Sequence, residues 1–138
     1  MKNLNLYTRL KGKRKSTIEK IVELTVEWCV DKWGVNGRRT ETLIAEVNWD
    51  EKSSMGDYDY KENLITIYPR ANLNIRDLVD TVIHEFTHQR QKMSSYHKVL
   101  KTKGYSSHPM EIEAFATAKE NRKGCWHDLK KTHCKKSK

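Results

Sequence analysis

Residues 75–93 read IRDLVDTVIHEFTHQRQKM. Apolar residues recur in this stretch at spacings of three and four, which predicts an amphipathic helix with one buried face. The apolar face comprises Ile75, Leu78, Val79, Val82, Ile83 and Phe86. Asn74 is the expected N-cap, and Asp77 falls in the first turn, where a negative charge is favourable. We therefore expect a helix from about Ile75 to Met93, on which a small sheet packs.

The same helix carries His84-Glu85-Phe86-Thr87-His88, which has the form H-E-x-x-H. Two histidines at positions i and i+4 lie on one helical face and can share a zinc ion, while the adjacent glutamate can take a proton from a water molecule. On the helical wheel this face lies nearly opposite the apolar one. The plainer alternative is a pair of exposed histidines on an ordinary amphipathic helix. The helical context favours the metal site, so the sequence predicts a zinc-dependent hydrolase.

A catalytic zinc usually takes three protein ligands and leaves a fourth position for water. The candidates for the third ligand are His97, His108, Glu111 and Glu113. In the last predicted helix Glu111 lies on the apolar side and Glu113 on the polar side. A buried carboxylate requires a positive partner, which would be a zinc ion or a basic residue such as Arg90 or Arg122. We favour Glu111, with His97 next and Glu113 still open.

The rest of the chain predicts an α+β fold. The expected elements are a helix over Ser16–Trp33 with Ser16 as N-cap, strands over Thr42–Trp49, Tyr58–Tyr60 and Leu64–Tyr68, a turn at Met55-Gly56-Asp57, and a helix from Pro109 to just before Gly124. Residues 93–107 remain unassigned. The 138 residues suit one domain over 1–138, with a small, mostly antiparallel sheet and basic ends at about 1–15 and 125–138 that can be flexible.

The chain carries a formal net charge of +9 and has a pI of about 9.5. The positive excess lies mainly in Lys11–Lys15 and in Lys130–Lys138. Such clusters suit nucleic acid or another acidic partner, although a solvated, solubilising tail has the same composition. The sequence contains no long apolar run of the kind that spans a membrane or forms a signal peptide. We therefore expect no membrane association and an intracellular, cytoplasmic location.

Three cysteines at wide spacing make a poor disulfide framework, which favours a reducing compartment. Cys29 lies in an apolar helical run and is expected to be a buried thiol. Near the end of the chain stand Cys125, His127, His133 and Cys134. Their spacing fits no standard zinc finger, so the group is either a second structural zinc site or part of a loose basic tail.

The H-E-x-x-H motif followed by Glu111-Ile112-Glu113-Ala114 resembles the gluzincin arrangement. From about Tyr58 to Glu120 the chain is similar to small single-domain gluzincins of phage and bacterial origin. The resemblance implies a zincin-like fold and a zinc metallopeptidase, in which His84, His88 and Glu111 hold the zinc and Glu85 is the catalytic base. It also implies that the host cell of a phage is one possible location. Many relatives place an acidic or amide residue four positions after the ligand glutamate, where this chain has Phe115.

In such an enzyme Glu85 assists a zinc-bound water in attacking a peptide bond. Tyr105, Tyr96 and His108 are the candidates for a second donor to the oxyanion. The resemblance further implies that an extended peptide pairs with the edge of the sheet, for which the Leu64–Tyr68 strand is the expected element.

Three other functions remain open. A nucleic-acid-associated protease similar to SprT proteins would use His97 as the third ligand. A zincin fold can also keep its metal and serve only as a binding module. A small basic nucleic-acid-binding protein with an accidental motif would bind no zinc, and its affinity would fall steeply with salt. The sequence leaves the substrate and the oligomeric state undetermined.

Overall fold

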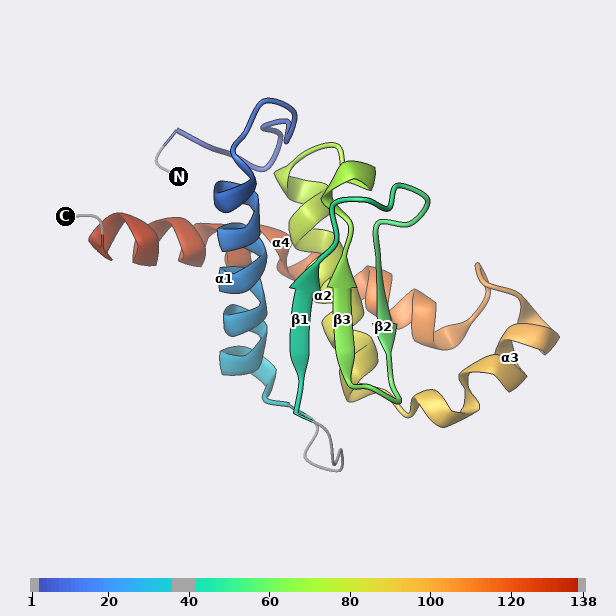
Figure 1. Ribbon diagram of the computed structural model, residues 1–138. Helices are drawn as coiled ribbons and strands as arrows, with labels where there is room; N and C mark the ends of the chain where they lie inside the picture. The colour runs from blue at the N-terminus through green and yellow to red at the C-terminus, as the bar shows by residue number, and fades with distance from the viewer. Residues whose placement is uncertain (1–2, 36–41, 137–138) are drawn as a thin grey trace.

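The computed structural model describes residues 3–35 and 42–136, with the backbone alone for residues 133–136. Along the chain it contains α1 (Lys15–Trp33), β1 (Ile44–Val47), β2 (Gly56–Asp59), β3 (Leu64–Ile67), α2 (Ile75–Arg90), α3 (Tyr96–Lys103) and α4 (Pro109–Lys136), with short 3-10 turns at Pro69–Ala71 and Met93–Ser95. Figure 1 shows the sheet in front of α2, with α1 beside β1 and α4 behind. The α+β class is confirmed.

The three strands form a mixed sheet in the order β1-β3-β2. Strand β2 pairs with β3 in antiparallel fashion, as expected for a hairpin, but β1 runs parallel to β3. The expectation of a mostly antiparallel sheet is therefore wrong for one of the two pairings. After β1 the chain crosses to the opposite edge of the sheet, where it forms β2. It then turns back, and β3 lies between β1 and β2. The edges of the sheet are thus β1 and β2, and the expected edge strand Leu64–Tyr68 lies in the centre.

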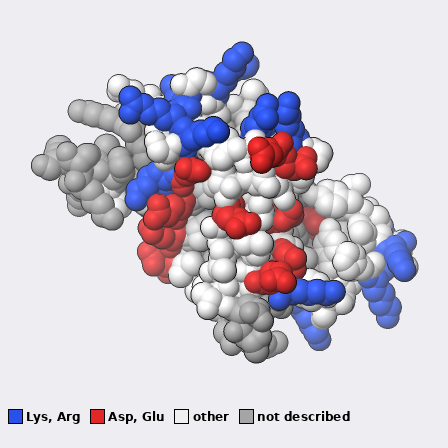
Figure 2. Space-filling model, in the orientation of Figure 1, with Lys and Arg blue, Asp and Glu red and all other residues white. Residues whose placement is uncertain are grey.

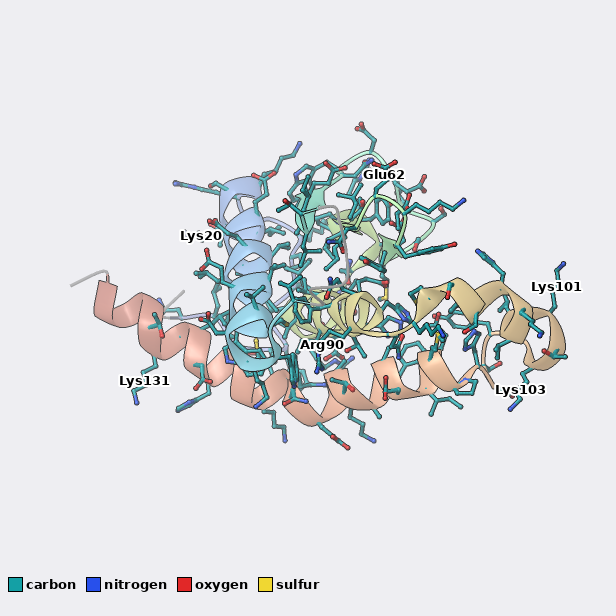
Figure 3. All side chains as sticks on the ribbon, turned by 90° about the horizontal axis from the view of Figure 1, so that it is seen from below. Lys20, Glu62, Arg90, Lys101, Lys103 and Lys131 are labelled. Atoms are coloured by element: carbon teal, nitrogen blue, oxygen red, sulfur yellow. The ribbon has the colours of Figure 1, made fainter. Side chains whose placement is uncertain are left out.

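Helix α2 is buried on two sides. Its apolar face contacts β2, β3 and α1, and the opposite face is covered by α4. Figure 3 shows α2 and α4 side by side. Asn74 caps α2 as predicted, because its side chain accepts a hydrogen bond from the Asp77 backbone N–H at 2.9 Å. The helix ends at Arg90, three residues before the expected end.

Helix α4 is longer than the sequence suggested. It was expected to end before Gly124, but it continues to Lys136. Beyond the glycine, Cys125, Trp126 and Leu129 are buried in the core shared with α1. A glycine inside a helix destabilises it by about 1 kcal/mol relative to alanine. Burial of these three apolar side chains stabilises the longer helix by more than that.

Helix α1 begins one residue before its expected N-cap. Arg14 occupies the N-cap position and forms no side-chain capping hydrogen bond, while Ser16 lies within the first turn. The C-terminal end agrees with prediction, because Gly34 follows the helix with a φ of 75°.

The expected turn at Met55-Gly56-Asp57 is also wrong, since β2 starts at Gly56. The β1 strand is shorter than the predicted Thr42–Trp49. Residues 93–107, which had no assignment, contain α3.

The basic N-terminal segment is fixed to the domain. Three backbone hydrogen bonds hold it to the start of α2: Leu10 N to Leu73 O, Ile75 N to Thr8 O, and Arg76 N to Leu6 O. The Leu10 side chain is buried in the main core. Thus residues 6–10 are an ordered part of the fold. Among the described helices, none combines the length and apolar character needed to cross a membrane.

Candidate metal centre

The two histidines of the motif lie on the side of α2 that α4 covers. His84 is 7% exposed and His88 is 3% exposed. Their ring centroids are 4.9 Å apart. The alternative of two exposed surface histidines is therefore wrong. Buried imidazoles require polar partners, and α4 supplies one that both histidines share.

Glu111 in the first turn of α4 is the common partner of both histidines. Its Oε1 atom lies 2.7 Å from His84 Nε2 and 3.0 Å from His88 Nε2. The carboxylate is 4% exposed, which agrees with its expected position on the apolar side of the helix. Glu113 is exposed. The structure thus brings together the three residues that the sequence favoured.

Neither arginine considered as a partner for Glu111 has that role. Arg122 Nε lies 2.9 Å from Asp80 Oδ1 in a half-buried ion pair. The Arg90 guanidinium lies over the Trp33 ring, 5.9 Å from its centroid. The observed positive or proton-donating groups around Glu111 are the histidines and a tyrosine.

Burial raises the pKa of Glu111, but hydrogen bonds from His84, His88 and Tyr96 outweigh it and hold that pKa well below its ordinary value. The Tyr96 hydroxyl donates to Glu111 Oε2, the oxygen that the histidines leave free. Glu111 is therefore an ionised carboxylate at neutral pH, as a metal ligand must be.

Glu85 is also buried beside the histidines, but the carboxylate that contacts both Nε2 atoms is that of Glu111. One carboxylate oxygen of Glu85 and one nitrogen of each of His84 and His88 lie within 4.8 Å of one another. Burial raises the pKa of Glu85 to about 7, although the charges of the two histidines act in the opposite direction. A carboxyl group with this pKa can accept and return a proton near neutral pH.

Gln91 orients His88, a role that was not predicted from the sequence. Its Nε2 donates to the backbone oxygen of Met110 at 3.0 Å and to Glu113 Oε1 at 2.7 Å. These two acceptors assign the amide orientation, so Gln91 Oε1 accepts from His88 Nδ1 at 2.6 Å. His88 Nε2 then faces Glu111: it donates to the carboxylate when the imidazole carries both protons, and it has a free lone pair when the imidazole is neutral. A glutamine three residues after the second histidine was the available signal.

Phe115 contacts the other histidine. Its ring centroid lies 4.4 Å from that of His84, with the rings 67° apart. This is the position at which many gluzincins have an acidic or amide side chain. Here an aromatic edge, and not a hydrogen bond from that position, limits the rotation of His84.

The remaining candidates fall into two groups. Tyr96, His97 and Tyr105 all line the cavity above the histidines. Tyr105 is 52% exposed, and burial together with the charges of Glu111 and Glu85 raises its pKa to about 12. The His97 side chain is exposed and contacts the Tyr96 ring, with 5.7 Å between centroids. Among the described interactions, none joins His97 to His84 or His88.

His108 is fully buried beneath Tyr96 and has no place in the cavity wall. Its Nδ1 accepts from the Met110 backbone N–H at 3.2 Å, and its Nε2 lies 3.0 Å from the Tyr96 backbone oxygen. The rings of His108 and Tyr96 are stacked, with 4.2 Å between centroids. With both nitrogens engaged, His108 supports Tyr96 and cannot serve as the expected oxyanion donor.

The cavity over the histidines has a volume of about 290 Å³, and a groove of about 380 Å³ adjoins it between α2 and α4. Strand β2 forms one wall of the cavity through Gly56, Asp57 and Tyr58. Within the described part of the chain, β2 is an edge strand of the sheet and pairs with β3 alone.

The second Cys/His group is not assembled by the described residues. Cys125 is buried, whereas His127 is exposed on the outer side of α4. The side chains of His133 and Cys134 lie outside the described part of the chain.

No family model, curated protein or solved structure matches the chain.

Proposed function

We propose that the chain is a zinc-dependent peptidase of the gluzincin type, with His84, His88 and Glu111 as metal ligands. The observation that carries the proposal is a single buried carboxylate oxygen of Glu111 within 3.0 Å of both Nε2 atoms.

The three donor atoms are of the types that zinc binds, and the two separations to Glu111 are close to those of zinc ligands. Zinc takes imidazole nitrogen and carboxylate oxygen at about 2.0–2.2 Å, so tetrahedral ligand atoms lie roughly 3.3 Å apart. The observed separations of 2.7 and 3.0 Å are shorter by a few tenths of an ångström, which small side-chain rotations can supply. The ionised Glu111 would also offset part of the charge of the ion.

A zinc ion bound there would act as a Lewis acid and lower the pKa of a water molecule. Glu85 would accept a proton from the attacking water and return it to the leaving nitrogen of the peptide. Tyr96 and Tyr105 line the cavity, and their hydroxyls are the candidate donors to the oxyanion. The edge strand β2, which forms one wall of the cavity, would hold an extended substrate through backbone hydrogen bonds.

The test compares metal content and hydrolysis in the same preparations. We expect about one zinc per chain in the wild type, much less in Glu111→Ala and in His84→Ala, and nearly wild-type zinc in Glu113→Gln. Hydrolysis of a mixed peptide library should disappear in Glu85→Gln while its zinc is retained. Zinc loss in Glu85→Gln would instead mean that this residue is a ligand.

Other outcomes identify the alternatives. If Glu111→Ala keeps its zinc and His97→Ala loses it, the third ligand is His97 and the SprT-like function gains support. A wild type that holds zinc but cleaves no library peptide is a binding module. A wild type that takes up no added zinc has an accidental motif, and the proposal fails.

A further inference from the structure

A large basic groove lies at the N-terminal end of α2, away from the metal centre. It has a volume of about 860 Å³, and it is lined by residues from three segments of the chain: 9–18, 49–50 and 69–73. The motif histidines lie in the C-terminal half of α2, and His84 is nine residues along the helix from its first residue, Ile75. At 1.5 Å per residue, Ile75 and His84 are separated by roughly 14 Å along the axis.

The groove concentrates positive charge. Its cationic lining residues are Arg9, Lys11, Lys13, Lys15 and Arg70, and Asp50 is the single acidic residue among its described lining. Within the described part of the chain, none of the five cations lies in ion-pair distance of a carboxylate. Figure 2 shows Lys and Arg side chains gathered over this upper end of the molecule. Unpaired like charges around one concavity attract a polyanion.

These cations belong to an ordered wall and not to a loose tail. The segment that carries four of them is bound to α2 by the backbone hydrogen bonds of Leu6, Thr8 and Leu10, and Arg9 pairs with Asn74 in an isolated β-bridge. Because the backbone is already fixed, binding a ligand would require ordering of side chains only, which lowers its entropic cost.

Aromatic and apolar groups accompany the charges. The Lys15 ammonium lies 5.1 Å from the Trp49 ring centroid, and Trp49 Nε1 donates to Glu19 Oε2 at 2.9 Å, which fixes the indole at the groove. Leu73 is 53% exposed at the same place. Cations along a groove with an aromatic ring are the combination that binds single-stranded nucleic acid through phosphates and unstacked bases.

We propose that this groove binds the sugar-phosphate backbone of single-stranded nucleic acid. A flat membrane surface does not enter a concavity, whereas a flexible strand can follow it. A duplex keeps its bases stacked and offers no free base face to Trp49. The proposal stands whether or not the metal centre is a peptidase.

The test measures binding of a fluorescent oligothymidylate to the full chain by anisotropy over a range of salt concentrations. The groove variant is Lys11→Ala/Lys13→Ala/Arg70→Ala. Three lost phosphate contacts should reduce the slope of log K against log salt by about 2, and weaken binding at 100 mM salt by roughly tenfold or more. The zinc content and thermal unfolding of this variant should match the wild type, since all three side chains are exposed.

The matched control removes the same charge elsewhere. Lys98→Ala/Lys101→Ala/Lys103→Ala changes three exposed lysines of α3, and Figure 3 shows Lys101 and Lys103 pointing away from the body of the molecule. Both triple variants lose three charges, which weakens long-range attraction to the oligonucleotide equally. Apart from that shared effect, the affinity of the control should be within about twofold of the wild type. Equal weakening of the two triple variants would overturn the proposal, as would tighter binding to a duplex or to phosphatidylserine vesicles, or no binding by the wild type.

Discussion

His88 Nδ1 and Gln91 Oε1 are joined by a hydrogen bond of 2.6 Å, which fixes the imidazole so that Nε2 faces Glu111. Gln91 lies at the C-cap of α2 and also donates to the Met110 backbone oxygen in α4. The same amide therefore orients a candidate ligand and joins the two helices that form the metal centre. Such partners of metal-binding histidines restrict both the tautomer and the ring orientation.

Gln91→Ala should weaken zinc affinity by roughly 10- to 100-fold while leaving the protein folded, because His88 loses the partner that fixes its tautomer. Competition with a zinc chelator measures the affinity. The control is Glu113→Gln, which alters another partner of Gln91 at an exposed position and should change zinc affinity little. An unchanged affinity in Gln91→Ala would mean that this hydrogen bond has no part in metal binding.

The sequence predicted α2 and the assembled site because both depend on helical periodicity. In α2 the spacing of Ile75, Leu78 and Phe86 identified the face that packs in the core. The same helical periodicity, applied to the last helix, placed Glu111 on its buried side. Asn74 was recognisable as a cap from its residue type and from the polar first turn. Each of these inferences used neighbours within a few turns of one helix.

Features that depend on contacts distant in sequence were not predictable in this way. Nothing local distinguishes β1 parallel to β3 from β1 antiparallel to it, because the strand pattern is the same in both. The role of His108 was assigned wrongly because its position before Pro109 said nothing of the Tyr96 backbone oxygen above it. Gln91 was missed because its spacing of three residues from His88 was the one signal for it, and that spacing alone does not identify its partner Met110 in α4.

The sequence predicts that the last helix ends before Gly124, but α4 continues past this residue to Lys136. In the structure this glycine is an interior helical residue, and a methyl group added to it would meet nothing within 4 Å. Gly124→Ala should therefore stabilise the fold by about 0.5–1 kcal/mol through higher helix propensity. Urea unfolding followed by circular dichroism measures the change. A loss of stability would indicate that the helix ends at this glycine in solution.

Gly56 allows β2 to lie against α2 beside the cavity. An added Cβ would be 2.6 Å from Thr81 Cγ2 and 3.1 Å from the Thr66 backbone oxygen. Gly56→Ala should therefore destabilise the protein by about 1–3 kcal/mol, as expected for overpacking. Urea unfolding measures this loss.

The clash at Gly56 can be separated from other effects by a second substitution. Thr81→Ser removes the methyl group and retains the hydroxyl that donates to Asn72 Oδ1 and Asp77 O. The double variant Gly56→Ala/Thr81→Ser should recover a large part of the lost stability, so that the two changes are strongly non-additive. Strict additivity would show that the close approach to Thr81 is not the cause, and would leave the contacts with the Thr66 carbonyl oxygen and with Ile67 Cδ1.

The hydrogen bond from the Tyr68 hydroxyl to Asp57 Oδ2, at 2.5 Å, gives a testable pH dependence. This bond and, to a lesser extent, burial raise the pKa of Tyr68 to about 12, against about 10 for an unfolded tyrosine. Below pH 10 both the folded and the unfolded states keep the phenol proton, so the contribution of the bond is complete. Between about pH 10 and 12 the unfolded state loses its proton first, and the contribution falls as pH rises.

Tyr68→Phe should thus lower the free energy of unfolding by a constant amount up to about pH 10, and the difference from the wild type should shrink between pH 10 and 12. Urea unfolding at a series of pH values measures that difference. Tyr7→Phe serves as the control, because Tyr7 is exposed and its removal should have little effect at any of these pH values. A difference for Tyr68→Phe that grows with pH would have the opposite sign to the expected one, and would mean that the folded state favours the ionised phenol.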